Sequence, residues 1–106
     1  MVIIETSVFT RLVRGLMSDD EYAELQEALL GRPGMGDRIP GSGGLRKVRW
    51  GLEGGGKRGG VRVIYYWVVS AEQIRMLYIY PKSRRTNLTR EQIAALKQIV
   101  ERWNNE

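Results

Sequence analysis

The sequence predicts an α+β fold, in which one antiparallel sheet packs against an N-terminal helical hairpin and a C-terminal helix. Three observations predict it. Two apolar stripes with helical spacing precede residue 33, three strand-like runs lie between residues 45 and 80, and a further helical stripe follows residue 90. The length of 106 residues is that of one domain, placed at residues 1–106. The expected order of elements is β-α-α-β-β-β-α.

The N-terminal half contains the predicted strand and helical hairpin. Residues 1–5 are a short β-branched run typical of a strand, and Thr6 or Ser7 can cap the helix that follows. Residues 18–21 form a capping box with acidic side chains in the first turn, which predicts a second helix, ended by Gly31 and Pro33. The two helices carry apolar stripes at i, i+3 and i+4 spacing: Phe9, Leu12, Val13 and Leu16, then Tyr22, Leu25, Ala28 and Leu29.

Three strands and a helix are predicted after a glycine-rich loop. Residues 45–50 alternate, with Leu45, Lys47 and Arg49 on one face. Residues 61–69 are apolar on both faces, which is typical of a central strand covered on both sides, and residues 74–80 form the returning strand of a hairpin. A second capping box at residues 89–92 opens the terminal helix, whose stripe is Ile93, Leu96, Val100 and Trp103.

Composition excludes several kinds of chemistry. The chain has no cysteine and no histidine, so thiolate catalysis, Cys-based zinc sites and His-based general bases are excluded, and we expect neither a metal site nor a cofactor. The N-terminus lacks the basic segment of a signal peptide, and no apolar run approaches the length of a membrane span. We therefore expect a cytoplasmic protein that has no contact with a membrane.

The charge is concentrated in the middle of the chain. The net charge is +5, but residues 45–90 contain eleven basic and two acidic residues, whereas both flanks are net acidic. This distribution is typical of a protein with a polyanionic partner, nucleic acid being the first candidate, although a solvated basic face without a partner is the alternative. Residues 51–57 match the spacing of a phosphate-binding P-loop, but Arg58 replaces the magnesium-binding hydroxyl and a strand follows instead of a helix.

Arg62 is the most informative basic residue. It lies on a mostly apolar face of the central strand, where a cation needs an anionic partner. That partner is either an external anion or an internal carboxylate such as Glu53 or Glu72. Trp50 and Tyr66 are expected on the same face as Arg62, where they could stack on bases, although core packing is the stronger expectation for Trp50.

Several segments of the sequence resemble those of a known protein family, the RelE/HigB-type toxins of bacterial type II toxin–antitoxin systems. These segments are residues 39–50, a glycine-rich turn containing Lys57, residues 60–66 with Arg62, and Tyr80-Pro81-Lys82 followed by Asn87-Leu88-Thr89 and a helix. The resemblance covers essentially the whole chain. It implies the small RelE-like α+β domain and a metal-independent endoribonuclease that cleaves mRNA on the ribosome and so inhibits translation. It also implies a cognate antitoxin, often a helix-turn-helix protein.

The resemblance and the chemistry of RNA cleavage together suggest roles. Lys57 is the first candidate for the base that takes the 2′-OH proton, and Lys82 the second. Arg62 would hold the scissile phosphate, Arg84 or Arg85 would neutralise the leaving 5′-oxygen, and Tyr80 could stack on a base. The expected RNA or ribosome contacts are Arg46, Lys47, Arg49, Arg58 and Arg85.

Two rival functions stay open at this stage. A ParE-like toxin has the same fold but inhibits DNA gyrase through protein contacts and cleaves nothing. A non-catalytic RNA-binding module would use the same basic surface. The basic cluster and the set of Lys57, Arg62 and Lys82 favour the ribonuclease.

Overall fold

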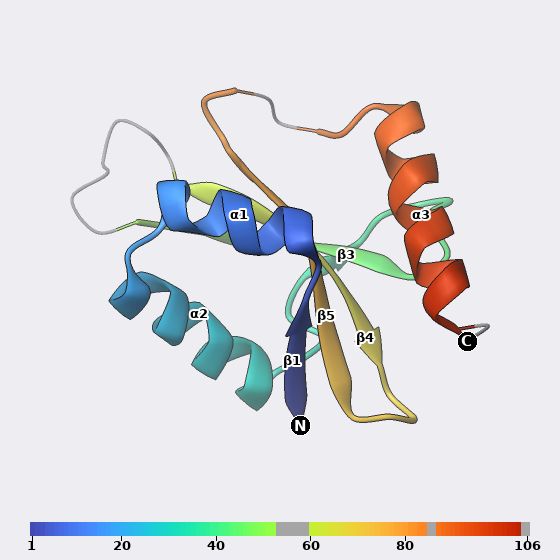
Figure 1. The fold of residues 1–106 in the computed structure, drawn as a ribbon, viewed down its shortest axis with the longest axis horizontal. Coiled ribbons are helices and arrows are strands. Elements are labelled where there is room, and N and C mark those ends of the chain that lie inside the picture. The colour runs from blue at the N-terminus through green and yellow to red at the C-terminus, as the bar shows by residue number, and fades with distance from the viewer. Residues whose placement is uncertain (53–59, 85–86, 105–106) are drawn as a thin grey trace.

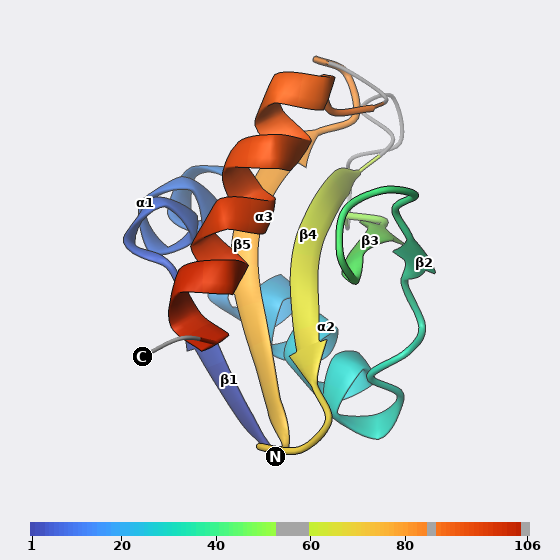
Figure 2. The same ribbon diagram turned by 90° about the vertical axis from the view of Figure 1, so that its right-hand side faces the viewer.

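The computed structural model describes residues 1–52, 60–84 and 87–104. In these ranges the elements are β1 (Val2–Glu5), α1 (Ser7–Leu16), α2 (Asp19–Gly31), β2 (Asp37–Arg38), β3 (Leu45–Trp50), β4 (Val61–Val68), β5 (Gln73–Pro81) and α3 (Arg90–Asn104). Figures 1 and 2 show α1 and α2 on one side of the sheet and α3 on the other. The predicted α+β class, the helical hairpin and the terminal helix are confirmed.

The strands of the described residues form one five-stranded sheet in the order β1-β5-β4-β3-β2. The expectation of an antiparallel sheet is wrong for one pair, because β1 runs parallel to β5, with Ile3 opposite Ile74. The sheet is therefore mixed. The prediction also omitted β2, a two-residue strand that pairs with β3 through Asp37 and Arg38. A two-residue edge strand has too short a pattern to be predicted from alternation.

The predicted caps are present at the start of each helix. The Thr6 hydroxyl accepts a hydrogen bond from the backbone of Phe9 at 3.0 Å. Ser18 and Glu21 form the reciprocal capping box of α2. At the start of α3 the Thr89 hydroxyl accepts from the Gln92 backbone, and the Gln92 side chain accepts from the Thr89 backbone. These side chains satisfy backbone donors that have no partner inside the helix, so each helix begins at a defined residue.

Each face of the sheet has its own core. On the face of α1 and α2, the side chains of Phe9, Leu25 and Tyr65 are fully buried within the larger cluster. On the face of α3, a smaller cluster contains Leu45, Ile64, Leu77, Tyr80, Leu96 and Val100. β4 contributes to both, as its two-sided apolar pattern predicts.

Gly60 fixes the start of β4. Its φ is +82°, and a Cβ at this position would lie 2.1 Å from the carbonyl oxygen of Trp50. Its own carbonyl accepts a hydrogen bond from the Lys82 backbone at 3.1 Å. Gly60 thus allows the end of β3, the start of β4 and the segment after β5 to lie close together. Arg49, Arg62 and Lys82, which lie on these three segments, are therefore near the same end of the sheet.

Candidate functional site

A row of three side chains crosses the sheet on the face of α3. Arg62 on β4 lies opposite Arg49 on β3 and, on its other side, opposite Tyr80 on β5. Arg49 is exposed, whereas Arg62 is only 5% exposed and Tyr80 only 2%. Like charges directly opposite each other on neighbouring strands are unfavourable, and burial of one of them adds to the effect. The row is therefore a place where a bound anion would be stabilised.

Arg62 has limited internal compensation among the described residues. One guanidinium nitrogen donates to the carbonyl oxygen of Val61 at 3.4 Å. Of the two carboxylates suggested as partners, Glu72 lies in the turn at the opposite end of β4, so it is excluded. Glu53 lies outside the described residues.

Lys47 lies one row further along the same face, opposite Ile64. Its ammonium group donates to the Asn87 side-chain oxygen at 2.8 Å. Partial burial, and then the charges of Arg49 and Arg62, lower the pKa of Lys47 below its ordinary value, while Asp37 acts in the opposite direction. A lysine in such surroundings gives up its proton more readily than an exposed one.

The segment after β5 brings two more basic residues to the end of the sheet where Arg62 lies. Lys82 and Arg84 are exposed, and their backbone nitrogens donate to the carbonyl oxygens of Gly60 and Pro81. Because of the bond between them, Lys82 lies opposite Gly60, which is two residues before Arg62 in the chain. Lys57, Arg58 and Arg85 lie outside the described residues, so their predicted roles stay predictions.

Arg46 is separated from the other basic residues. Its guanidinium group donates to the carbonyl oxygens of Gly34 and Gly36, at 3.2 and 2.8 Å. Alternation along β3 points it to the face of α1 and α2, away from Lys47 and Arg49. Trp50 also packs in the core of that face, so the expectation that it shares a face with Arg62 is wrong.

Tyr80 lies in the row opposite Arg62, but its side chain is packed in the core. It belongs to the core of the α3 face, and its ring centroid lies 5.9 Å from that of Tyr78. A ring that is 2% exposed offers little surface to a nucleobase. Its position opposite Arg62 on the neighbouring strand, inside the core, suits packing better than base stacking.

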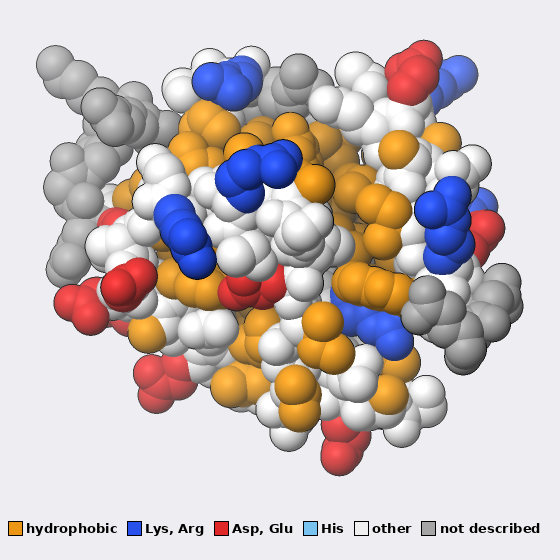
Figure 3. All heavy atoms as spheres, viewed as in Figure 1, with side chains coloured by type: hydrophobic (Ala, Val, Ile, Leu, Met, Phe, Trp, Pro, Cys, Tyr) orange, Lys and Arg blue, Asp and Glu red, His pale blue; other side chains and the backbone are white. Residues whose placement is uncertain are grey.

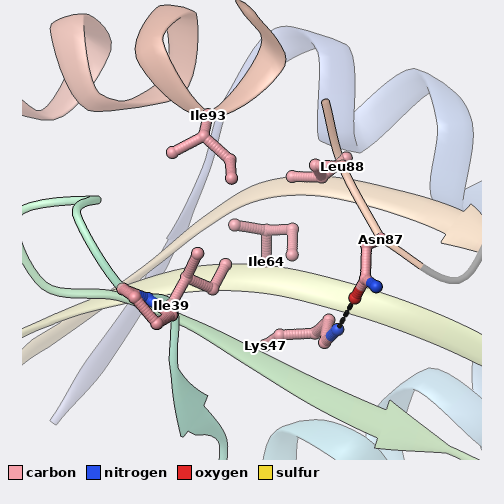
Figure 4. A pocket seen from close by; sticks show the side chains of 7 residues that line it. Ile39, Lys47, Ile64, Asn87, Leu88 and Ile93 are labelled. Atoms are coloured by element: carbon pink, nitrogen blue, oxygen red, sulfur yellow. Dashed lines mark hydrogen bonds between the residues drawn. The ribbon is translucent and has the colours of Figure 1, made fainter. Parts of the chain in front are cut away.

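A cavity of about 220 Å³ adjoins Lys47. Figure 4 shows Ile39, Ile64, Leu88 and Ile93 around it, with the hydrogen bond from Lys47 to Asn87 at its rim. The sequence interpretation gave Asn87 no role and did not foresee this cavity. Alternation along β3, which places Lys47 on the same face as Arg49, is a signal that could have identified Lys47. For Asn87 the sequence offered only its place in a segment similar to the toxin family.

The face of the molecule drawn in Figure 3 carries scattered charged side chains. Figure 3 shows acidic side chains over α2, and Lys and Arg side chains on the visible face are separated by apolar and acidic ones. Residues 1–52, 60–84 and 87–104 contain no group of three or more carboxylates placed to hold a metal ion. None of the helices in these ranges is both long and apolar enough to span a membrane.

The described residues form a small α+β domain with a row of basic side chains across β3 and β4 on the face of α3. A model of the family described as the RelE toxin of the RelE/RelB toxin–antitoxin system matches residues 1–106, and the chain belongs to this family. Among solved structures, a mutant of the Escherichia coli toxin RelE in the free state is similar, with a TM-score of 0.60, 12% identity and 95% of each chain covered. At this identity the likeness shows the fold alone.

Proposed function

We propose that this RelE-family toxin is a ribosome-dependent mRNA endonuclease that inhibits translation in the cytoplasm, with residues 1–106 acting as one catalytic domain. The observation that carries the proposal is the row of Arg49, Arg62 and Tyr80 beside Lys47. A partly buried cluster of cations around a lysine of lowered pKa suits the binding and cleavage of a phosphodiester.

The proposed reaction is an internal attack within the RNA. The 2′-oxygen of one ribose forms a bond to the adjacent phosphorus, the bond from phosphorus to the 5′-oxygen of the next nucleotide breaks, and a 2′,3′-cyclic phosphate results. The 2′-OH proton passes to a neutral lysine amine, and the leaving 5′-oxygen takes a proton from water. In-line positioning of the strand on the ribosome supplies a large part of the rate.

Lys47 is the base that we now favour among the described lysines. Its lowered pKa enlarges the fraction of neutral amine near pH 7, whereas the Lys82 side chain lies exposed on the segment after β5. Lys57, the first choice from the sequence, stays a prediction. This assignment changes Lys47 from a backbone contact to a reacting group.

The arginines are proposed to stabilise charge. Arg62 donates to the non-bridging oxygens of the phosphate, whose negative charge increases in the transition state, and its buried position strengthens that interaction. Arg84 and Arg85 neutralise the leaving oxygen, while Arg49 and Arg58 contact the RNA or ribosome backbone. Arg46 is already bound to two backbone carbonyls, so it contributes less.

The partners follow from the family. The matching family is named for a toxin paired with an antitoxin, and we propose that a cognate antitoxin, of helix-turn-helix type, binds this chain. Toxicity that is relieved by co-expression of a small protein encoded next to the toxin would test this partner.

Mapping of RNA 5′ ends after induction tests the activity. We expect new ends within translated codons, and we expect them to disappear when initiation on the same transcript is blocked. The variant Arg62→Met should lose these ends and its toxicity, whereas Arg14→Met, an exposed residue on α1, should keep both. Toxicity without new ends, accompanied by arrested gyrase, would instead establish a ParE-like inhibitor.

A further inference from the structure

We propose that the cavity beside Lys47 binds the base of the nucleotide whose 2′-OH attacks, and that the Asn87 amide selects a base with a keto group. The proposal rests on the proposed function and deepens it, because it assigns the base specificity of the same site. It is drawn from the shape of the cavity and from the hydrogen-bonded pair of Lys47 and Asn87 at its rim (Figure 4).

The cavity has the size and walls that a nucleobase requires. Its volume is about 220 Å³, and apolar cavities of about 150 Å³ already take a benzene ring. Ile64 is fully buried at its floor, and the side chains of Ile39, Leu88 and Ile93 approach from three other segments. Branched aliphatic walls on several sides suit a flat ring, which gains contact on both of its faces.

The polar rim of the cavity presents donors. The Asn87 Oδ1 atom accepts from the Lys47 ammonium group, and the Nδ2 group of the same amide, which can only donate, is a further donor at this rim. The amine of Lys47 donates as well while it is protonated. A base edge with a carbonyl oxygen, as in uracil or guanine, fits a donor; an amino group at the same place, as in cytosine or adenine, opposes it.

The position of Lys47 places a nucleobase bound in the cavity beside the proposed site of cleavage. A nucleotide with its base in the cavity has its ribose at the rim, where the Lys47 nitrogen lies 2.8 Å from the Asn87 oxygen. The adjoining phosphate then extends toward Arg49 and Arg62, which lie one row further along the strands. Asn87 is therefore a positioning residue for Lys47 and a specificity residue for the base.

Binding is tested on the free protein with uridine 3′-monophosphate and cytidine 3′-monophosphate, which differ at the exocyclic group in question. The readout is the NMR shift of isoleucine δ1-methyl groups. We expect the methyl signals of Ile39, Ile64 and Ile93 to move, with uridine bound about fivefold more tightly, the effect of one hydrogen bond. Ile99, exposed on α3, should not move. Equal affinity, or shifts confined to other methyl groups, would overturn the proposal.

Two variants carry the test to the reaction. Ile93→Trp fills the cavity and should lower cleavage at least tenfold, while Ile99→Trp on the same helix should leave it unchanged. Asn87→Asp replaces the donor with an acceptor, and the base 5′ of the remaining cuts should shift from keto to amino types; unchanged base frequencies would contradict the inference. If the wild type cuts mRNA and neither variant alters the cuts, the cavity has no such role although the proposed function stands. If the methyl signals respond as expected and no mRNA is cut, the cavity binds a base and the proposed function fails.

Discussion

Arg49 and Arg62 lie directly opposite each other in the antiparallel pair of β3 and β4, one exposed and the other 5% exposed. Two cations in this arrangement repel each other in the free protein and attract a phosphate between them. Partial burial, and then the same two charges, lower the pKa of Lys47. The pair therefore links the stability of the toxin, its proposed affinity for RNA and the acidity of its proposed base.

The first prediction concerns the stability contribution of Arg62. Arg62→Met removes a buried positive charge that faces another one, so we expect the free energy of unfolding in urea to rise by about 1 kcal/mol. Cleavage and toxicity should be lost in the same variant. Arg14→Met, on the exposed face of α1, is the control and should stay within about 0.5 kcal/mol of the wild type. A loss of several kcal/mol in Arg62→Met would instead reveal an internal ion pair.

A second prediction concerns pH. Since the pKa of Lys47 is lowered, its neutral fraction grows as the pH rises toward that pKa, and single-turnover cleavage on purified ribosomes should accelerate by up to tenfold per pH unit before it levels off. Lys47→Arg keeps the charge but cannot lose its proton, so it should remove the acceleration.

As part of the same prediction, the lowered pKa of Lys47 determines how the free energy of unfolding changes with pH. A lysine whose folded pKa is below its unfolded value destabilises the fold while it is protonated, and this effect disappears as the pH rises through the folded pKa toward the ordinary value of 10.5. The stability of the wild type relative to Lys47→Met should therefore increase between pH 7 and pH 10 in urea titrations. A decrease would mean that Lys47 gains a net favourable partner on folding.

Gly60 supplies a third prediction. Gly60→Ala would place its Cβ against the Trp50 carbonyl and force a residue with a side chain to a φ of +82°, so we expect a loss of at least about 2 kcal/mol in thermal unfolding. Gly15→Ala is the matched control, because nothing lies within 4 Å of its added Cβ in helix α1. This second change should raise the stability by about 0.5–1 kcal/mol.

Tyr65 supplies a fourth prediction, on the face remote from Lys47. Its hydroxyl accepts from the Gly36 backbone at 2.9 Å and donates to the Pro33 carbonyl at 2.6 Å. Tyr65→Phe leaves a buried donor and acceptor without this partner, so it should lower the free energy of unfolding by about 1–3 kcal/mol. Cleavage by the folded fraction should be unchanged; a specific loss of cleavage would indicate that this loop takes part in the site.

Much of the architecture could be predicted from local pattern. The caps at Thr6, Ser18 and Thr89 and the two-sided apolar run of β4 indicated their elements correctly, because each depends on neighbours a few residues apart. The parallel pairing of β1 with β5 could not be predicted in this way. It depends on which strand lies beside another about 70 residues away, and a β-branched run is compatible with either direction.

The geometry of the candidate site could be predicted only in part. The sequence placed Lys47 and Arg49 correctly on one face of β3, since alternation assigns faces reliably within one strand. The separation of Arg46 from Lys47 follows from that alternation together with carbonyl groups of the preceding loop, which no spacing encodes. The role proposed for Asn87 depends on a tertiary hydrogen bond across 40 residues, which only the folded chain reveals.

The most direct measurement uses purified ribosomes paused with a defined mRNA in the decoding site. Wild-type protein and Arg62→Met are added in turn, and the RNA ends are mapped. The account predicts one new cut within the paused codon for the wild type, a 2′,3′-cyclic phosphate on the upstream fragment, and at least a hundredfold slower cutting by Arg62→Met. An uncut message in the presence of folded wild-type protein, or equal cutting by both proteins, would contradict it.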